Sequence, residues 1–267
     1  MNEFEYDADT TVVAGETPGS YTATVNDRWS AVGSRPNGGY VLGIALRALL
    51  AEVSHPDPLV VSAYFLRPSV PGPVELTTEV VRAGRRISTG EVRVHQDGKE
   101  TLRAVANFAD LDAADGRTAV FGEPPKLPAP EDCLNLADGA SIPGLTIADR
   151  FDYRYAEPLG WAQGTPSGEP RSELWIRFAD GRDADSLSLP SIVDAAAPAV
   201  MELGEWTSST IELTVHLRAR PAPGWLACRI STRYVIGGYH EEDFDIWDAT
   251  GALVAQGRQL ALLPPAR

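Results

Sequence analysis

Three polar residues in the second half of the chain lie in surroundings that are otherwise apolar or small. Asp194 falls about one turn into a predicted apolar helix, inside the segment 191–197. Thr210 begins a predicted strand, and Gln259 lies on a strand face whose other residues are Ala and Gly, which leaves room beside its amide. A carboxylate in such a place can accept a proton, although an unpaired charge there costs free energy. The ordinary alternative is structural: Asp194 as a cap or ion-pair partner, Thr210 as a plain strand residue, and Gln259 as a hydrogen-bonding partner of the backbone.

Common catalytic and metal-binding signatures are absent from the sequence. It contains no G-x-S-x-G, Walker A or H-E-x-x-H pattern. Its four histidines are far apart and show no metal-ligand spacing. We therefore expect no metal site and no cofactor, and the candidate chemistry rests on carboxylate, hydroxyl and amide groups.

The chain contains an internal repeat. The segment 66–72 returns as 217–224, and the Pro-Gly pairs inside them are 152 residues apart (223 − 71 = 152). The same shift carries Asn107 onto Gln259 (259 − 107 = 152) and places Leu42 at the position of Asp194 (194 − 152 = 42). A repeat of this length indicates a duplicated domain. Because Leu42 has no carboxylate, we expect one active site per chain.

Each half places an apolar helix before a run of strands. Tyr40 to Val53 is apolar nearly all round, which is typical of a buried helix. A second helix is predicted from Leu189 to about Leu203, where Pro198 should kink it or shorten its regular part. The predicted strands are 21–25, 60–66, 74–82, 87–95 and 102–111, then 151–155, 173–178, 209–217, 225–235, 243–247 and 253–263.

This order of elements predicts an α+β fold in which two long buried helices are each wrapped by a curved antiparallel sheet. The two sheets can join edge to edge, which removes exposed edges. We divide the chain into an N-terminal domain (1–112), a linker (113–148) rich in Pro, Gly, Ala and Asp, and a C-terminal domain (149–267). Residues 1–20 show little periodicity and are predicted to be a loose lead-in.

Composition excludes several classes of partner. The formal net charge is −14, so nucleic acid and anionic membranes are unfavourable partners, although local arginines can still bind a small anion. No apolar run approaches the roughly 20 residues that span a bilayer. The acidic N-terminus has no apolar segment of a signal peptide, and the two cysteines form no framework, so we expect a cytoplasmic protein.

Over most of residues 21–263 the sequence resembles the acyl-CoA thioesterase II family of double-hotdog thioesterases. In that family an Asp, a Thr or Ser and a Gln hold the attacking water, and the matching motifs fall on Asp194, Thr210 and Gln259. Two departures are Ala195, where the family often has His, and Pro198 within the same helix. The resemblance rests on Trp29, Pro36-Asn37-Gly38-Gly39-Tyr40, Phe65-Leu66-Arg67-Pro68, Val193-Asp194-Ala195, Thr210-Ile211-Glu212-Leu213-Thr214-Val215-His216 and Val254-Ala255-Gln256-Gly257-Arg258-Gln259.

The resemblance implies an acyl-CoA thioesterase of fatty acid metabolism that releases a free acid and CoA. Backbone N–H groups at a helix N-terminus would stabilise the oxyanion. Gly38 and Gly39 either let the substrate approach the first helix closely or serve tight helix–sheet packing. Pairing of chains is compatible with this architecture, but the sequence does not determine the oligomer. The candidates for binding the CoA phosphates are Arg35, Arg67, Arg85 and Arg86.

Two other functions remain open at this point. A hotdog hydratase or dehydratase is disfavoured, because no His follows an Asp at the Asp-x(4)-His spacing. A non-catalytic acyl-CoA binding or sensing module is the main alternative. The combination of Asp194, Thr210 and Gln259 argues against it, since a binder has no need of a carboxylate in an apolar helix.

Overall fold

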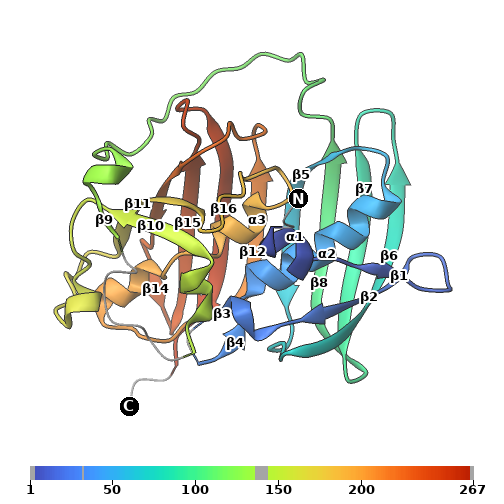
Figure 1. Cartoon of the computed structure of the whole chain (residues 1–267), viewed down its shortest axis with the longest axis horizontal. Coiled ribbons are helices and arrows are strands. Elements are labelled where there is room, and N and C mark those ends of the chain that lie inside the picture. The colour runs from blue at the N-terminus through green and yellow to red at the C-terminus, as the bar shows by residue number, and fades with distance from the viewer. Residues whose placement is uncertain (1–3, 32, 136–143, 265–267) are drawn as a thin grey trace.

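The protein is described here by a computed structural model that places residues 4–31, 33–135 and 144–264. One continuous antiparallel sheet of fourteen strands forms the framework, in the order β1-β2-β6-β7-β8-β5-β12-β16-β15-β13-β11-β10-β9, with β14 paired to β15. The helices α1, α2 and α3 lie against one face of this curved sheet (Figure 1). No helix within the described ranges has the length and hydropathy needed to cross a membrane.

The first half of the chain supplies the long helix and one half of the sheet. Its elements are α1 (Glu5–Asp9), β1 (Val13–Ala14), β2 (Ser20–Val25), the 3₁₀ helix η1 (Asp27–Trp29), β3 (Ser30–Ala31), β4 (Arg35–Pro36), α2 (Gly38–Glu52), β5 (Asp57–Phe65), β6 (Gly72–Ala83), β7 (Ser88–Gln96) and β8 (Lys99–Ala109). The short strands β3 and β4 form a separate ribbon that leads into α2.

The second half repeats the strands but not the long helix. Its elements are η2 (Pro130–Asp132), β9 (Leu134–Asn135), η4 (Thr146–Asp149), β10 (Phe151–Tyr155), η5 (Trp161–Gln163), β11 (Arg171–Phe178), α3 (Leu189–Val193), η6 (Ala199–Leu203), β12 (Ser209–Leu217), β13 (Leu226–Ser231), β14 (Val235–Ile236), β15 (Tyr239–Trp247) and β16 (Leu253–Leu262).

The two halves meet at the β5–β12 pair, where residues 152 positions apart touch each other. Ser62 is paired with Thr214 (214 − 62 = 152), and their hydroxyl groups are 2.9 Å apart. On the helical side, the Ser191 hydroxyl donates to the Gly39 carbonyl at 2.6 Å (191 − 39 = 152). Contacts between equivalent residues place a local twofold relation at the centre of the sheet, and they confirm the repeat spacing.

The repeat spacing changes by one residue in the last strand. Val105 of β8 is paired with Ser62, and Arg258 of β16 is paired with Thr214, so the shift there is 153 (258 − 105 = 153). The equivalence of Asn107 with Gln259 is therefore wrong, and Ala106 is the counterpart of Gln259. A one-residue shift in a strand exchanges its two faces. Accordingly, Asn107 lies on the outer face, whereas Gln259 is 3% exposed on the inner face.

The first predicted helix is confirmed with slightly different ends. Helix α2 begins at Gly38, because the Asn37 side-chain oxygen accepts a hydrogen bond from Tyr40 N at 2.9 Å. This is an N-cap, which satisfies one of the unpaired N–H groups of the first turn. Apolar residues are buried on all sides of the helix, as expected for an element enclosed by a curved sheet.

The second predicted helix is much shorter than expected. Helix α3 ends at Val193, Asp194 is its C-terminal cap, and a 3₁₀ helix starts at Ala199, directly after Pro198. Proline has no N–H to donate and disfavours helical geometry in the residue before it, so the chain leaves the helix ahead of Pro198. The expectation of a long buried helix holds for the first repeat and fails for the second.

The N-terminal segment is also more ordered than predicted. Tyr6 in α1 is 1% exposed, and its hydroxyl group is 2.8 Å from the Ser191 hydroxyl of α3. A side chain at Gly43 of α2 would collide with the Tyr6 hydroxyl oxygen, so Gly43 makes room for this ring. Helix α1 therefore packs at the junction of α2 and α3 and does not form a loose lead-in.

Part of the predicted linker has no regular structure. Residues 110–129 contain no helix or strand, and they cross the top edge of the molecule from β8 toward β9 (Figure 1). The strand β9 then pairs with β10 at the far edge of the sheet. Residues 136–143 of the predicted linker lie outside the described residues.

Candidate active site

Asp194 lies where the end of α3 meets the start of α2. Its Oδ2 atom accepts hydrogen bonds from Gly39 N at 2.7 Å and from the Asn37 amide nitrogen at 3.0 Å. The same amide nitrogen donates to the backbone oxygen of Asp194 at 2.8 Å. On the other side, the Tyr153 hydroxyl donates to the Ala195 carbonyl at 2.8 Å and holds the turn that follows α3. Both repeats therefore contribute to the position of one carboxylate.

The glycine pair at the start of α2 permits this close approach. A Cβ atom on Gly39 would lie 2.7 Å from the Asp194 Cβ, and one on Gly38 would lie 2.7 Å from the Phe65 ring. Both distances are too short for a side chain, so glycine is required for packing against α3 and against the sheet. The Gly39 N–H, one of the donors at the N-terminus of α2, is already used because it donates to Asp194.

The surroundings of Asp194 make it a weaker acid than usual. Burial raises the pKa of the Asp194 carboxyl to about 6, against the opposing effect of the hydrogen bonds from Gly39 and Asn37. The group is therefore ionised at neutral pH, yet its pKa is close enough to neutrality for it to accept a proton during a reaction.

Thr210 and Gln259 are in direct contact, as expected for two residues of one site. The Thr210 hydroxyl donates to the Gln259 side-chain oxygen at 2.8 Å. A β-bulge between Thr210 and Glu212 places Thr210 opposite Ala261 on the inner face, although even-numbered neighbours such as Thr214 face outward. Bulges commonly re-aim a side chain next to a functional site. The bulge is what brings the hydroxyl to Gln259.

A buried glutamate completes this polar group and was missed by the sequence analysis. Glu242 is 1% exposed, and its Oε2 atom accepts a hydrogen bond from the Gln259 amide nitrogen at 2.5 Å. Its Oε1 atom accepts from the backbone N–H of Ala199. The pKa of Glu242 is raised to about 7, mainly by burial and to a smaller extent by the charge of Asp194. The signal was present, since Glu242 follows the inward alternation of His240, Phe244 and Ile246, but the predicted strand began at Asp243, four residues after the start of β15 at Tyr239, and so left Glu242 out.

Asp194 and the Thr210–Gln259 pair lie on adjoining elements. Val193, the last residue of α3, packs directly on β16, because a Cβ on Gly257 would be 2.7 Å from the Val193 Cγ1 atom. Gly257 is two residues from Gln259 on the same inner face. The charge of Asp194 also contributes to the raised pKa of Glu242. The three predicted residues thus lie on adjoining parts of the fold: Asp194 directly after α3, Thr210 on β12 and Gln259 on β16.

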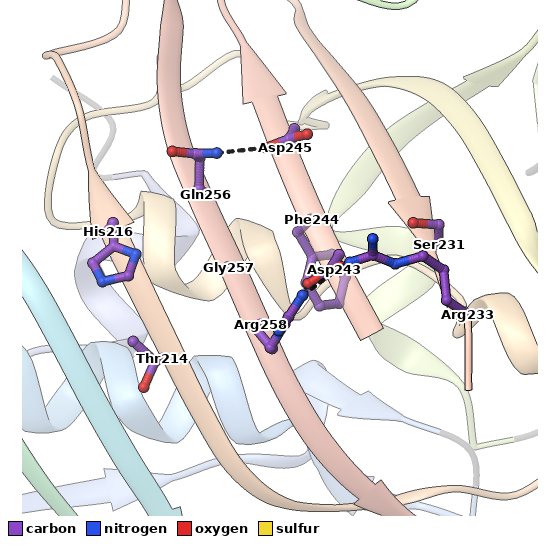
Figure 2. A pocket seen from close by; sticks show the side chains of 10 residues that line it. All are labelled: Thr214, His216, Ser231, Arg233, Asp243, Phe244, Asp245, Gln256, Gly257 and Arg258. Atoms are coloured by element: carbon purple, nitrogen blue, oxygen red, sulfur yellow. Dashed lines mark hydrogen bonds and ion pairs between the residues drawn. The ribbon is translucent and has the colours of Figure 1, made fainter. Parts of the chain in front are cut away.

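Two hollows lie near these elements. One of about 550 Å³ opens on the outer face of the sheet and contains none of the predicted site residues. Figure 2 shows that Arg233 and Arg258 turn toward Asp243 in this hollow, so the acidic side chain already neutralises part of their charge. The other is an apolar crevice of about 10 Å³ next to Asp194, between α3 and the sheet. It is lined by Ile176, Ile192, Val193, Ala196, Cys228, Arg229, Ile230, Phe244 and Ile246.

The four candidate arginines separate into two groups. Arg35 is exposed two residues before Asn37, and Arg67 is exposed two residues after Phe65, whose ring abuts Gly38. Both therefore lie at the end of α2 that meets Asp194. Arg85 and Arg86 follow β6 in a turn at the other end of α2, where Gly90 contacts Leu49, and they are too distant to share this site. Within the described ranges, no group of three or more His, Cys, Asp or Glu residues is arranged to hold a metal ion.

Comparison with known proteins matches both halves of the chain. The family model of the acyl-CoA thioesterase N-terminal domain matches residues 25–109, and that of the C-terminal domain matches residues 130–263. A crystal structure from Thermobifida fusca YX with a provisional thioesterase II designation is 31% identical, with a TM-score of 0.88 and 99% of each chain covered.

Two further solved structures show the same fold at lower identity. A protein of unknown function with a hot dog fold from Alicyclobacillus acidocaldarius is 20% identical over 98% of each chain, with a TM-score of 0.86. The acyl-CoA thioesterase II TesB2 from Mycobacterium marinum is 19% identical, covering 97% of this chain and 98% of its own, with a TM-score of 0.73. With its large antiparallel sheet and few helices, the chain has an α+β hotdog fold, and it belongs to the acyl-CoA thioesterase family of thioester hydrolases.

Proposed function

We propose that the protein hydrolyses acyl-CoA thioesters with a water molecule held by Asp194, Thr210 and Gln259. The observation that carries this proposal is the half-buried Asp194 carboxylate, whose pKa is raised to about 6 beside the bonded Thr210–Gln259 pair. A binding module would gain nothing from the free-energy cost of that carboxylate.

In this mechanism Asp194 takes a proton from the water as the water oxygen attacks the thioester carbonyl carbon. Thr210 and Gln259 hold the water in line with that carbon, and positioning of this kind is worth several powers of ten in rate. The C–S bond then breaks, the CoA thiolate takes up a proton, and the acyl group leaves as the free acid. Gly38 N–H, a first-turn donor without an intrahelical partner, is the group we assign to the oxyanion.

The remaining parts of the substrate are assigned to the surroundings of Asp194. The acyl chain enters the apolar crevice between α3 and the sheet, which must widen to admit it because its present volume is about that of one water molecule. Arg35 and Arg67, together with Gly38 and Gly39, form the entrance and bind the CoA moiety. We also propose that the two repeats, 1–112 and 149–267, form a double hotdog that acts in fatty acid metabolism in the cytoplasm.

The proposal is tested by thiol release from short, medium, long and aromatic acyl-CoAs, measured for the wild type and for Asp194→Asn. We expect turnover in the wild type and a loss of about a hundredfold or more in the variant, the scale of a lost general base. Binding of acyl-CoA without turnover of any thioester would favour the non-catalytic module. Equal turnover in both proteins would retain the thioesterase and exclude Asp194 as its base.

A further inference from the structure

Glu242 lies at the centre of a hydrogen-bonded chain that ends at Thr210. Both of its oxygens are used: Oε1 accepts from Ala199 N–H and Oε2 accepts from the Gln259 amide nitrogen. The Gln259 side-chain oxygen in turn accepts from the Thr210 hydroxyl. The carboxylate thus reaches the proposed water-binding residues through one amide group.

The fold does not need this carboxylate. In the first repeat, strand pairing places Gly90 opposite Ala106, and these are the counterparts of Glu242 and Gln259. There the space belongs to α2, because a Cβ on Gly90 would be 2.7 Å from the Leu49 Cδ2 atom. The same arrangement of strands therefore packs with apolar groups in one repeat and with buried carboxylate and amide groups in the other.

The interruption of the second helix provides the donor that holds Glu242. Because α3 stops at Val193 and a new turn starts after Pro198, the Ala199 N–H is a first-turn donor with no intrahelical partner. It bonds to Glu242 and fixes one oxygen of the carboxylate. The other oxygen, Oε2, then faces Gln259. When the carboxyl group is ionised, this oxygen can accept a hydrogen bond but cannot donate one.

A side-chain amide can be turned by half a rotation, which exchanges its oxygen and nitrogen. With ionised Glu242 on one side, the Gln259 nitrogen must face Glu242 and the Gln259 oxygen must face Thr210. The opposite orientation would place the amide oxygen against a carboxylate oxygen with no proton between them. We propose, on the basis of the function above, that Glu242 is a positioning residue that locks the Gln259 amide in this orientation.

The orientation determines how Thr210 and Gln259 can hold a water molecule. The Thr210 hydroxyl donates its proton to Gln259, so it can only accept a hydrogen bond from the water. Gln259 has a second N–H that does not bond to Glu242, and this N–H can donate to the water. A water that donates to Thr210 and accepts from Gln259 is fixed in direction, with a second proton left for Asp194.

The charged and titratable neighbours of Glu242 support a role for its protonation state. Asp194 after α3 and Glu241 on the same strand are acidic and raise the pKa of Glu242 beyond the effect of burial. His240 shares its strand face and is also buried, which lowers the pKa of its imidazole and favours the neutral form. The adjacent strand β16 presents the neutral amide of Gln259. Because the pKa of Glu242 lies at about 7, orientation of the amide should be lost as the pH falls through neutrality.

The test compares Glu242→Gln with Glu241→Gln. Both variants replace a carboxylate by an amide on β15, but Glu241 bonds to the backbone of Arg233 and Tyr234 and not to the site. In Glu242→Gln, an amide that keeps the bond to Ala199 turns its NH₂ toward Gln259 and forces Gln259 to flip. We expect kcat to fall about tenfold to a hundredfold with little change in KM, whereas Glu241→Gln keeps the wild-type values.

The orientation itself is read without substrate. The measurement is the NMR signal of the side-chain amides in protein labelled at glutamine. The chain has four glutamines, so these signals are few. The signal of Gln259 is identified as the one that is missing in Gln259→Leu. In the wild type, this signal should titrate near pH 7 and the pH profile of kcat should fall on the acidic side of that midpoint. Both features should vanish in Glu242→Gln and persist in Glu241→Gln, where loss of the Glu241 charge should only move the midpoint to slightly lower pH.

A Gln259 signal that does not titrate, or that is unchanged in Glu242→Gln, would overturn the proposal. So would a Glu242→Gln protein that loses thermal stability but keeps the kcat and pH profile of the wild type, because that result describes a purely structural residue. A wild type that hydrolyses no thioester would overturn the proposed function alone, and the amide signals would still decide whether Glu242 orients Gln259.

Discussion

The two repeats have the same strands but opposite chemistry at four equivalent inner positions. In the first repeat these positions carry only apolar residues and glycine, and in the second they carry two carboxyl groups, a hydroxyl and an amide. Even the bulge is duplicated, between Pro58 and Val60 in β5 and between Thr210 and Glu212 in β12. The equivalent pairs are Leu42 and Asp194, Pro58 and Thr210, Gly90 and Glu242, and Ala106 and Gln259.

The difference follows from the helices. Helix α2 runs over 15 residues, and its side chains fill the concave face of its own half of the sheet. Helix α3 has five residues, so the space beyond Val193 is open to polar side chains and to the turn that carries Asp194. The shorter helix thus leaves less apolar packing and more room for the polar groups of the candidate site. We infer that these groups lower the free energy of unfolding contributed by the second repeat.

The first repeat nevertheless supplies part of the site. Asn37 and Gly39 donate the hydrogen bonds that hold Asp194, and both belong to the start of α2. Neither half contains a complete set of groups. In the proposed mechanism the duplication therefore yields one composite site, in which one copy provides the donors to Asp194 and the other provides the carboxylate.

The difference between the two repeats is tested most strongly by moving the carboxylate from the second repeat to the first. In the double variant Asp194→Leu with Leu42→Asp, the acid stands at the equivalent position of the first repeat, where Pro58 and Ala106 offer no hydroxyl or amide. We expect thioester hydrolysis to fall by about a hundredfold or more, as for loss of the base alone. Recovery of activity in the double variant, measured against Asp194→Leu, would show that the two repeats are chemically equivalent.

The single variant Leu42→Asp tests the packing side of the comparison. Leu42 is fully buried in an intact helix, so a carboxylate there would lack the partners that Asp194 has. We expect a loss of several kcal/mol in the free energy of unfolding, seen as a lower midpoint in urea. The matched control is Leu50→Asp, on the same helix at a partly exposed position, which should cost much less.

Removal of the water-holding groups should give the next largest effect. Thr210→Val keeps the shape of the side chain but removes the hydroxyl, and Gln259→Leu removes the amide. Each should lower kcat by about tenfold to a hundredfold through loss of positioning. Because the two groups act on one water, the double variant should be close to the more severe single variant. Fully multiplicative effects would indicate that they act at separate places.

The pH dependence of stability gives a smaller effect. The pKa of Asp194 is about 6 in the folded protein against a usual value of 3.8, so the folded state holds a proton that the unfolded state has lost. Stability therefore falls as the pH rises from about 4 to about 6, by about 3 kcal/mol for this group. Asp194→Asn should remove that slope and melt above the wild type at pH 8, with a smaller difference at pH 5. A difference that does not grow with pH would contradict the burial of an ionised Asp194.

Sequence patterns indicated the polar residues of the candidate site, but they did not predict the contacts that join these residues. Asp194, Thr210 and Gln259 stood out as polar groups in apolar segments, and the last two do form a bonded pair. Pro198 was a clear signal of an interrupted helix, but where the helix ends depends on the tertiary contacts of Asp194.

Two errors have a common physical cause. The hairpin between β15 and β16 has five residues between the paired Trp247 and Leu253. The equivalent hairpin between β7 and β8 has four residues between the paired His95 and Glu100. Because of the extra residue, the counterpart of Gln259 is Ala106 and not Asn107. Similarly, a late strand start hid Glu242. In strands an error of one residue exchanges the inner and outer faces, so buried polar groups are lost most easily.

Whether one composite site serves each chain can be measured by calorimetric titration with an acyl-CoA thioether that cannot be hydrolysed. We expect one bound molecule per chain, with the same stoichiometry in Asp194→Asn, because that variant keeps the shape of the site. Binding of two molecules per chain, or binding that survives unchanged when Gly39 is replaced by Val, would contradict it.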